Sequence, residues 1–305
     1  MKKLSLSRPQ SMLATTVLVL LACLLVSCGG LALSIANAPA LVGPFDRFAG
    51  LAYGEGPRRR LDVYQPHSAR AGRAGAPVVV FWYGGAWQRG SKSQYRFVGA
   101  ALAESGFVAV LPDYRLYPQV RFPEFIDDGA AALRWVTQHA ADYGGDPQKI
   151  FLMGHSAGAH LAASLALDPS RLARAGVDPA QIRGLIGLSG PYDLTPNTAV
   201  LNRIFAAPYG PGDWQPLRLA GRDSPPALLL HGGDDSLVLP RNAEKLAAAL
   251  TAAGVAARAV IYPGKGHADT VAALSVPARG RAPVLEAVRA FVSERSGLSL
   301  PPARQ

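Results

Sequence analysis

The chain of 305 residues contains only two cysteines, Cys23 and Cys28, and both lie near its N-terminus. From residue 29 onward there is therefore no thiol for a disulfide, for a cysteine nucleophile or for a thiolate metal site. Histidines and carboxylates with the HExxH spacing of many zinc enzymes are missing as well. We accordingly expect neither a metal nor a cofactor.

Basic residues outnumber acidic ones by 31 to 21, which gives a formal net charge of +10. Three of them, Lys2, Lys3 and Arg8, belong to the N-terminal segment, and without these three the charge is +7. The arginines of the remaining chain are scattered and do not alternate with aromatic residues in a basic stripe. This pattern indicates an ordinary basic surface, so we expect no binding of nucleic acid.

Residues 1–28 have the pattern of an export signal. The basic start is followed by an apolar run, Met12 to Val26, that has the length of a signal peptide and is short for a membrane span. The run ends in Leu25-Val26-Ser27-Cys28, which resembles a bacterial lipobox and predicts lipidation of Cys28. We therefore expect a cell-envelope lipoprotein, anchored to a membrane by N-terminal lipid. Cleavage after Ala38, which would give a periplasmic protein, and an uncleaved anchor remain alternatives.

The most informative motif is Gly154-His155-Ser156-Ala157-Gly158. It follows an apolar run at 149–153 and opens an alanine-rich stretch, so a strand, a sharp turn and a helix are expected. The glycines leave room for this reversal, which holds the serine in a strained conformation with its hydroxyl outward. This is the pattern of a nucleophile elbow. Ser156 is thus the candidate nucleophile, and the N–H of Ala157 is a candidate oxyanion donor.

Partners for the serine follow two later apolar runs. The run at 227–230 ends in His231-Gly232-Gly233-Asp234-Asp235, and the run at 259–262 precedes His267. A serine hydroxyl needs a base, and the base needs a carboxylate that orients it. Only His267 follows the last predicted strand, so we expect it to be the base. The order of nucleophile, acid and histidine is that of α/β-hydrolases. Asp234 and Asp235 are both candidates for the acid, and Asp193 is a more distant one.

A fourth motif, Phe81-Trp82-Tyr83-Gly84-Gly85-Ala86-Trp87, follows the strand pattern at 77–80. With Asp113-Tyr114-Arg115-Leu116 and the motifs above, it resembles α/β-hydrolase esterases of the hormone-sensitive-lipase and kynurenine-formamidase-like type, over most of residues 60–295. The resemblance implies that Asp235 is the acid and that Gly85 and Ala86 are oxyanion donors. Tyr83 occupies the position where that family usually has histidine. We expect the Tyr83 hydroxyl, in place of the histidine, to support the loop that carries Gly85 and Ala86.

Alternating strand and helix patterns predict an α/β fold, namely an α/β-hydrolase with a mostly parallel central sheet flanked by helices. We expect a tether over residues 29–48, a catalytic domain over 49–297 and a tail over 298–305. Within the domain, residues 189–226 contain seven prolines and little periodicity. This segment favours a lid-like insertion over the site, and a solvent-exposed connection is the alternative.

Three aromatic residues are candidates to line the substrate pocket: Trp87, Tyr192 and Trp214. Packing in the core is the commoner role of a lone tryptophan. Because only residues 189–226 could cover the site, we expect small substrates. The sequence thus predicts a serine hydrolase that cleaves carboxylic esters through an acyl-enzyme. A formamidase-like or aminopeptidase-like amide hydrolase would carry the same triad, and a catalytically silent surface lipoprotein is a third possibility.

Overall fold

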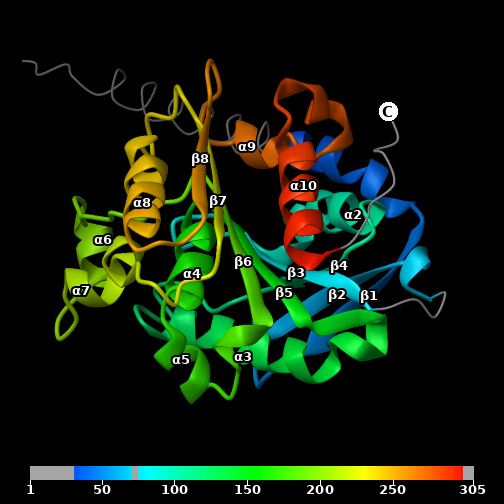
Figure 1. Ribbon diagram of the computed structural model, residues 1–305, viewed down its shortest axis with the longest axis horizontal. Helices are drawn as coiled ribbons and strands as arrows, with labels where there is room; N and C mark the ends of the chain where they lie inside the picture. Colours follow the sequence, from blue (N-terminus) through cyan, green and yellow to red (C-terminus); the bar gives the residue numbers. More distant parts are fainter. Residues whose placement is uncertain (1–30, 71–74, 298–305) are drawn as a thin grey trace, which may run out of the picture.

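The computed structural model describes residues 31–70 and 75–297. Cys28, the rest of the predicted signal segment and the predicted tail lie outside these residues. A single eight-stranded sheet forms the centre, and helices cover both of its faces (Figure 1). The strands are β1 (Phe45–Ala52), β2 (Arg60–Pro66), β3 (Ala76–Trp82), β4 (Val108–Pro112), β5 (Gly145–His155), β6 (Ile182–Leu188), β7 (Ala227–Gly232) and β8 (Ala257–Tyr262).

The helices alternate with the strands from β3 onward. The α-helices are α2 (Arg96–Glu104), α3 (Glu124–His139), α4 (Ala157–Ala166), α5 (Pro169–Arg174), α6 (Ala199–Ile204), α7 (Pro211–Trp214), α8 (Arg241–Ala252), α9 (Asp269–Ala272) and α10 (Val284–Ser296). Short 3₁₀ turns are η1 (Pro39–Leu41), η2 (His67–Arg70), η3 (Lys92–Tyr95), η4 (Ala140–Tyr143), η5 (Pro179–Gln181), η6 (Pro216–Leu219) and η7 (Val276–Arg281).

The strand order is β1-β2-β4-β3-β5-β6-β7-β8. Strand β2 runs antiparallel to both of its neighbours, and every other pairing from β4 to β8 is parallel. The predicted mostly parallel sheet is therefore confirmed. Because parallel strands all end at the same edge, the loops after β3, β5, β7 and β8 meet there. These are the four loops that carry the sequence motifs.

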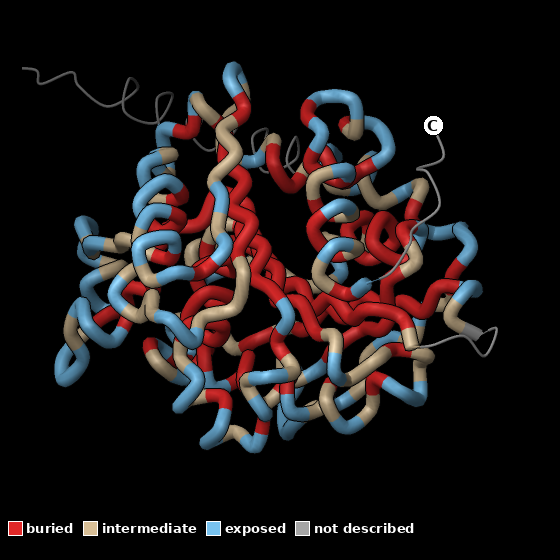
Figure 2. Tube along the Cα trace, viewed as in Figure 1, coloured by how far each residue is buried: buried red, intermediate tan, exposed pale blue. Residues whose placement is uncertain are grey.

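The core lies along the central strands, which Figure 2 shows buried in red. All seven residues of β3 are buried, including the run Val78, Val79 and Val80. A strand covered by helices on both faces has no solvent side, so its sequence is continuously apolar rather than alternating. This burial fixes the strand ends, and with them the positions of the loops at the sheet edge.

The structure differs from the predicted tether at residues 29–48. Residues 31–37 are helical, η1 follows, and β1 begins at Phe45. Asn37 docks this segment, since its side chain donates to Gln94 O at 3.0 Å and accepts from the N–H of Phe97 at 3.0 Å. Strand β1 was not predicted, because it is an edge strand of mixed exposure and its sequence therefore has only a weak hydrophobic pattern.

Residues 189–226 contain α6, α7 and η6, so they are neither a bare loop nor a separate domain. Phe205 and Trp214 from this insertion are buried and pack on one another with ring centroids 5.8 Å apart. Phe205 also packs edge-on against Trp87, which belongs to the loop after β3. The insertion is thus attached to the main domain through an aromatic cluster.

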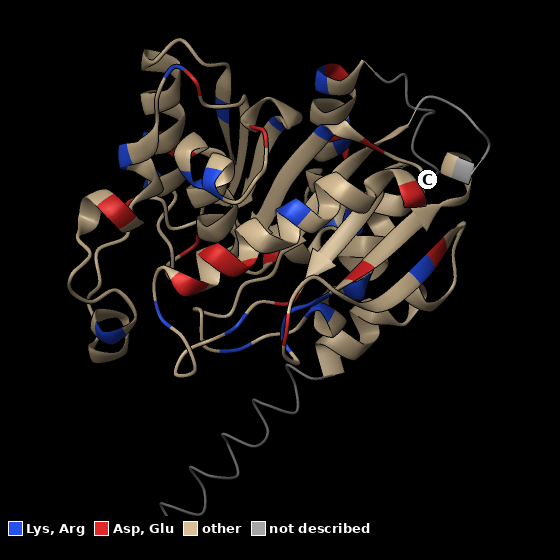
Figure 3. Cartoon of the chain, turned by 90° about the horizontal axis from the view of Figure 1, so that it is seen from below, with Lys and Arg blue, Asp and Glu red and all other residues tan. Residues whose placement is uncertain are grey.

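Charged residues of both signs are interspersed on the face drawn in Figure 3, without one continuous basic band. The absence of nucleic-acid binding stays a prediction. Over residues 31–70 and 75–297, no helix combines the length and the apolar composition that crossing a bilayer requires. In the same residues, no group of three or more His, Cys, Asp or Glu side chains is placed to hold a metal ion.

Candidate active site

The serine motif forms a tight turn between β5 and α4. Ser156 has φ 54° and ψ −121°, a conformation that side-chain-bearing residues rarely adopt. Its N–H donates to Leu188 O on β6 at 2.9 Å, which ties the turn to the neighbouring strand. A Cβ at Gly158 would lie 2.0 Å from Trp82 O, so only glycine allows α4 to approach β3 this closely. The chain therefore holds the serine hydroxyl at the sheet edge.

Ser156, His267 and Asp235 form one chain of hydrogen bonds. Nε2 of His267 lies 2.8 Å from Oγ of Ser156, and Nδ1 lies 2.7 Å from Oδ2 of Asp235. A carboxylate can only accept, so Nδ1 carries the imidazole proton and Nε2 is left as the base. The three residues come from the loops after β5, β8 and β7. The structure thus brings together the three side chains that the sequence selected.

The carboxylate of Asp235 is fully buried and held by main-chain donors. Its Oδ1 accepts from the N–H groups of Leu237 at 3.0 Å and Val238 at 2.9 Å. The two other acid candidates lie elsewhere. Asp234 is exposed, and its carboxylate accepts from Gly264 N at 3.3 Å. Asp193 forms an ion pair with Lys245. Asp235 is therefore the acid that contacts His267.

Two further histidines brace the triad. Nε2 of His155 donates to the main-chain oxygen of His267 at 3.0 Å. Nε2 of His231 donates to Val238 O at 2.7 Å and lies 3.2 Å from Oδ2 of Asp235. Burial, helped by the neighbouring His267, lowers the pKa of His155 to about 3, and burial also lowers the pKa of His231. Both rings are therefore neutral near pH 7 and act as hydrogen-bond donors.

The predicted oxyanion donors lie on two segments. Ala157 is the first residue of α4, where an N–H has no acceptor inside the helix. Gly85 and Ala86 lie in the loop of residues 84–90, which we call the oxyanion loop. No atom of the described residues accepts a hydrogen bond from the N–H of Gly85 or Ala86. A Cβ at Gly84 would come within 2.9 Å of Ser156 Cβ, so this loop lies directly against the nucleophile.

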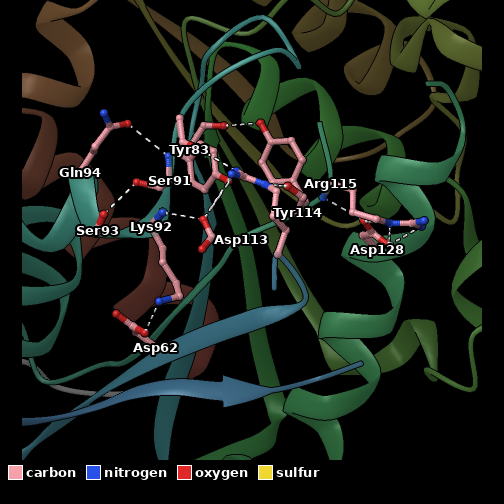
Figure 4. A network of polar contacts seen from close by, with 12 residues as sticks. Asp62, Tyr83, Ser91, Lys92, Ser93, Gln94, Asp113, Tyr114, Arg115 and Asp128 are labelled. Carbon is pink, nitrogen blue, oxygen red and sulfur yellow. Dashed lines mark hydrogen bonds and ion pairs between the residues drawn. The ribbon is translucent and has the colours of Figure 1, made fainter. Parts of the chain in front are cut away.

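Tyr83 precedes the oxyanion loop and is buried in a polar network with Asp113 and Lys92 (Figure 4). Its hydroxyl donates to Oδ1 of Asp113 at 2.9 Å, and the same oxygen accepts from the N–H of Lys92 at 2.8 Å. Burial, reinforced by Tyr114 and Asp113, raises the pKa of the Tyr83 phenol far above its usual range, so it remains a donor. The hydroxyl contacts no oxyanion donor itself, and its support of the loop is therefore indirect.

The three pocket candidates are buried. Trp87 is 3% exposed and packs edge-on against His160 on α4, with ring centroids 5.1 Å apart. Nε2 of His160 donates to Trp214 O at 2.6 Å, which joins the elbow helix to the insertion. The ring of Tyr192 lies against Gly190, where an added Cβ would meet it at 2.4 Å. These contacts are those of packed side chains, and a role in lining the pocket stays a prediction.

Two residues that support the site, Arg58 and His155, were not predicted from the sequence. Arg58 is one of three consecutive arginines and has the pattern of a surface charge, yet it donates to Oη of Tyr83 at 2.7 Å. The supporting role of His155 was also missed. For Arg58 the sequence offers one signal, a run of three arginines at residues 58–60 where β2 begins.

Comparison with known proteins places the chain in a family. The BD-FAE family model matches residues 61–250. Probable isoprenylcysteine alpha-carbonyl methylesterase ICME of Oryza sativa subsp. japonica is 33% identical over 249 residues, 75% of this chain and 59% of that protein. Esterase LipQ of Mycobacterium tuberculosis is 32% identical over 279 residues, 84% of this chain and 65% of that protein. The chain spans about three fifths of the length of the curated relatives it matches.

A solved structure agrees with these matches. Thermogutta terrifontis esterase 2 phosphoramylated by tabun superposes with a TM-score of 0.65 at 27% identity, over 82% of this chain and 94% of that chain. This likeness and the strand order confirm the α/β-hydrolase fold that the sequence predicted. The expected resemblance to α/β-hydrolase esterases is confirmed as well, and the chain belongs to the BD-FAE family.

Proposed function

We propose that this chain is a carboxylesterase-type serine hydrolase. The observation that carries the proposal is the unbroken hydrogen-bond chain from Ser156 through His267 to Asp235, at 2.8 Å and 2.7 Å. Beside it lie the N–H groups of Ala157, Gly85 and Ala86, which have no acceptor among residues 31–70 and 75–297. The esterase names of relatives such as LipQ support the same activity.

In the first half of the reaction, Oγ of Ser156 attacks the ester carbonyl carbon while Nε2 of His267 takes the hydroxyl proton. The carbonyl oxygen becomes an oxyanion and accepts hydrogen bonds from the N–H groups of Gly85, Ala86 and Ala157. Asp235 stabilises the imidazolium that forms. When the tetrahedral intermediate collapses, the alkoxide leaves with the proton from His267, and the acyl group remains on Ser156.

In the second half of the reaction, water hydrolyses the acyl-enzyme, and His267 again acts first as the base and then as the acid. Nε2 of His267 removes a proton from the water, whose oxygen attacks the acyl carbon. Collapse of the second intermediate releases the carboxylic acid and returns the proton to Ser156. The side chain of His267 is 17% exposed, so water can reach the base.

We further propose small ester substrates. The insertion at 189–226 packs onto the domain through buried Phe205 and Trp214, and it encodes no large cap. Relatives named as methylesterases are consistent with a small alcohol portion.

A fluorophosphonate probe and a substrate panel test the activity. We expect the probe to label the chain at Ser156, and the Ser156→Ala variant to remain unlabelled. Aryl and methyl esters with short acyl chains should be hydrolysed faster than N-formyl amides. Faster cleavage of the amides would show that the chain is an amide hydrolase. If the probe did not label the native chain, the catalytically silent binding protein would be the correct assignment.

We also propose that the protein is exported and lipidated at Cys28, which would make a membrane its partner. Support comes from Asn37, which lies in the competing cleavage motif Ala36-Asn37-Ala38. Its side chain bonds Gln94 O and Phe97 N, so cleavage after Ala38 would remove a residue that the fold uses. A lipoprotein keeps Asn37. Incorporation of a labelled fatty acid in a bacterial host should occur in the native chain and be lost in Cys28→Ser.

A further inference from the structure

The oxyanion loop adopts a conformation that its sequence does not favour. Ala86 and Trp87 are consecutive residues with φ of 53° and 59°, in the left-handed region that side chains disfavour. Such a loop persists only when its surroundings hold it. The N–H of Tyr117 donates to Trp87 O at 2.8 Å and so holds the middle of the loop. The entry is held by Oη of Tyr114, which donates to Tyr83 O at 2.9 Å, and a further restraint joins the entry to the exit.

Arg58, in the turn between β1 and β2, supplies this restraint. Its Nη2 donates to Oη of Tyr83, the residue before the loop, at 2.7 Å. The same nitrogen donates to the main-chain oxygen of Gly90, the last residue of the loop, at 2.8 Å. Its Nε donates to Tyr114 O, just past β4, at 2.8 Å. One guanidinium group therefore joins the entry of the loop, its exit and the neighbouring strand end.

The two ends of the loop are in direct contact at this point. A Cβ at Gly90 would lie 2.7 Å from the ring of Tyr83 and 2.8 Å from Gly84 O. The planar guanidinium presents several donors in a fixed geometry, which matches three acceptors on three segments. An ammonium group lacks this fork. The side chain of Arg58 is 28% exposed, so its donors lie at the edge of the buried network and can be reached from solvent.

We propose that Arg58 is a positioning residue for ester hydrolysis. By closing the base of the oxyanion loop, it sets the N–H groups of Gly85 and Ala86 at the distance from Ser156 that the oxyanion requires. It contacts no reacting atom. This inference rests on the proposed esterase function and adds a residue to it that lies outside every motif of the chain.

The test compares Arg58→Met with Arg59→Met. Arg59 lies in the same turn, but its guanidinium donates to Asp128 at 2.9 Å and contacts no part of the oxyanion loop. For Arg58→Met we expect kcat on an aryl ester to fall about 10²-fold with KM nearly unchanged, as for a small misplacement of catalytic groups. The rate of phosphonylation of Ser156 should fall in parallel. Arg59→Met should lower the thermal midpoint while retaining the native kcat.

Two further measurements separate positioning from loss of structure. Guanidinium ion, at concentrations far below those that unfold proteins, should restore part of kcat to Arg58→Met, because the vacated site is open to solvent. It should not raise the kcat of the native protein. In a double-mutant cycle, Arg58→Met and Tyr83→Phe should be non-additive, since both break the same junction. If Arg58→Met is insoluble, Arg58→Lys replaces it and should show a smaller fall in kcat.

An Arg58→Met or Arg58→Lys enzyme with native kcat would overturn the inference, and so would an Arg59→Met enzyme with an equal loss. Failure of guanidinium to restore any activity to Arg58→Met would overturn it too. These results would leave the proposed esterase function unchanged. That function fails only if the native chain neither hydrolyses esters nor reacts with the phosphonate.

Discussion

Nε2 of His155 donates to the main-chain oxygen of His267 across 3.0 Å, so the residue before the nucleophile holds the residue that activates it. The acceptor is a carbonyl oxygen, which requires the proton to be on Nε2 of His155. Burial lowers the pKa of His155 to about 3, so this bond persists without a charge. The base is thus restrained through its main chain by the elbow and through its side chain by Asp235.

Ser156→Ala and His267→Ala should each remove nearly all turnover, by about 10⁴-fold or more, while the fold is retained. The two side chains act as one unit, because the serine is a nucleophile only when the imidazole takes its proton. Removing both should therefore cost little more than removing either. Steady-state kinetics of the two single variants and the double variant measure this. A double variant far slower than both singles would show that the unit is assigned incorrectly.

Asp235→Asn should reduce kcat by about 10⁴-fold, because the amide favours the wrong imidazole tautomer. The adjacent Asp234→Asn provides the matched control, since the side chain of Asp234 is exposed and accepts from Gly264 N at 3.3 Å rather than from His267. We expect near-native kcat for the control. The reverse ranking would move the acid to Asp234.

Tyr83→Phe should lower kcat by roughly tenfold, less than the 10²–10³ that loss of an oxyanion donor itself costs. The change removes the hydroxyl that links Arg58 and Asp113 but leaves all oxyanion N–H groups in the chain. Tyr53→Phe is the control. Its hydroxyl also bonds Asp113, but it donates to the main-chain oxygen at 2.6 Å and not to the carboxylate that Tyr83 contacts, so we expect near-native kcat. Equal kcat values for the two variants and the native enzyme would reduce Tyr83 to a packing residue.

Stability should fall on acidification in part through His160. Burial lowers its pKa from 6.5 to about 4, so the unfolded chain binds a proton between these pH values and the folded chain does not. The free energy of unfolding therefore decreases as pH falls from about 6.5 toward 4, by up to about 3 kcal/mol from this residue. His155 acts in the same direction.

His160→Gln should flatten this decrease, since an amide can still donate to Trp214 O but does not titrate. Denaturant unfolding at pH 7 and pH 4.5 measures the difference. His139→Gln is the control, because the side chain of His139 is 43% exposed. An unchanged pH dependence in His160→Gln would show that another group dominates the acid response.

The central fold could be predicted because its strands are buried on both faces and read as continuous apolar runs. Strand β7 (Ala227–Gly232), for example, begins at the first residue of the apolar run at 227–230. The elbow could be predicted because close packing requires glycine on both sides of the serine: Gly158 lies against β3, and Gly154 lies against the start of α4. Strand β1 could not, since an edge strand with one exposed face carries little pattern. Helices α6 and α7 are short and lie among prolines, which hides any helical period.

The supports of the site are hidden from the sequence for a different reason. The partners of Arg58 lie 25, 32 and 56 residues away along the chain, so no local pattern can reveal them. Asp113, which accepts from Tyr83 and from the N–H of Lys92, at least belongs to a motif that the sequence displays. Arg58 belongs to no motif, and only the folded chain shows which of three adjacent arginines faces the loop.

Residues 31–42 pack against the domain, and this packing limits the distance between the domain and a membrane that holds a lipidated Cys28. With lipid on Cys28, only Gly29 and Gly30 separate the modified residue from Leu31, the first helical residue described. Three residue steps span at most about 10 Å, which is less than the radius of a domain of this size. Leu31 and Ile35, 62% and 53% exposed, would then lie at headgroup level. An enzyme anchored in this way would carry out its reaction close to the surface of the bilayer.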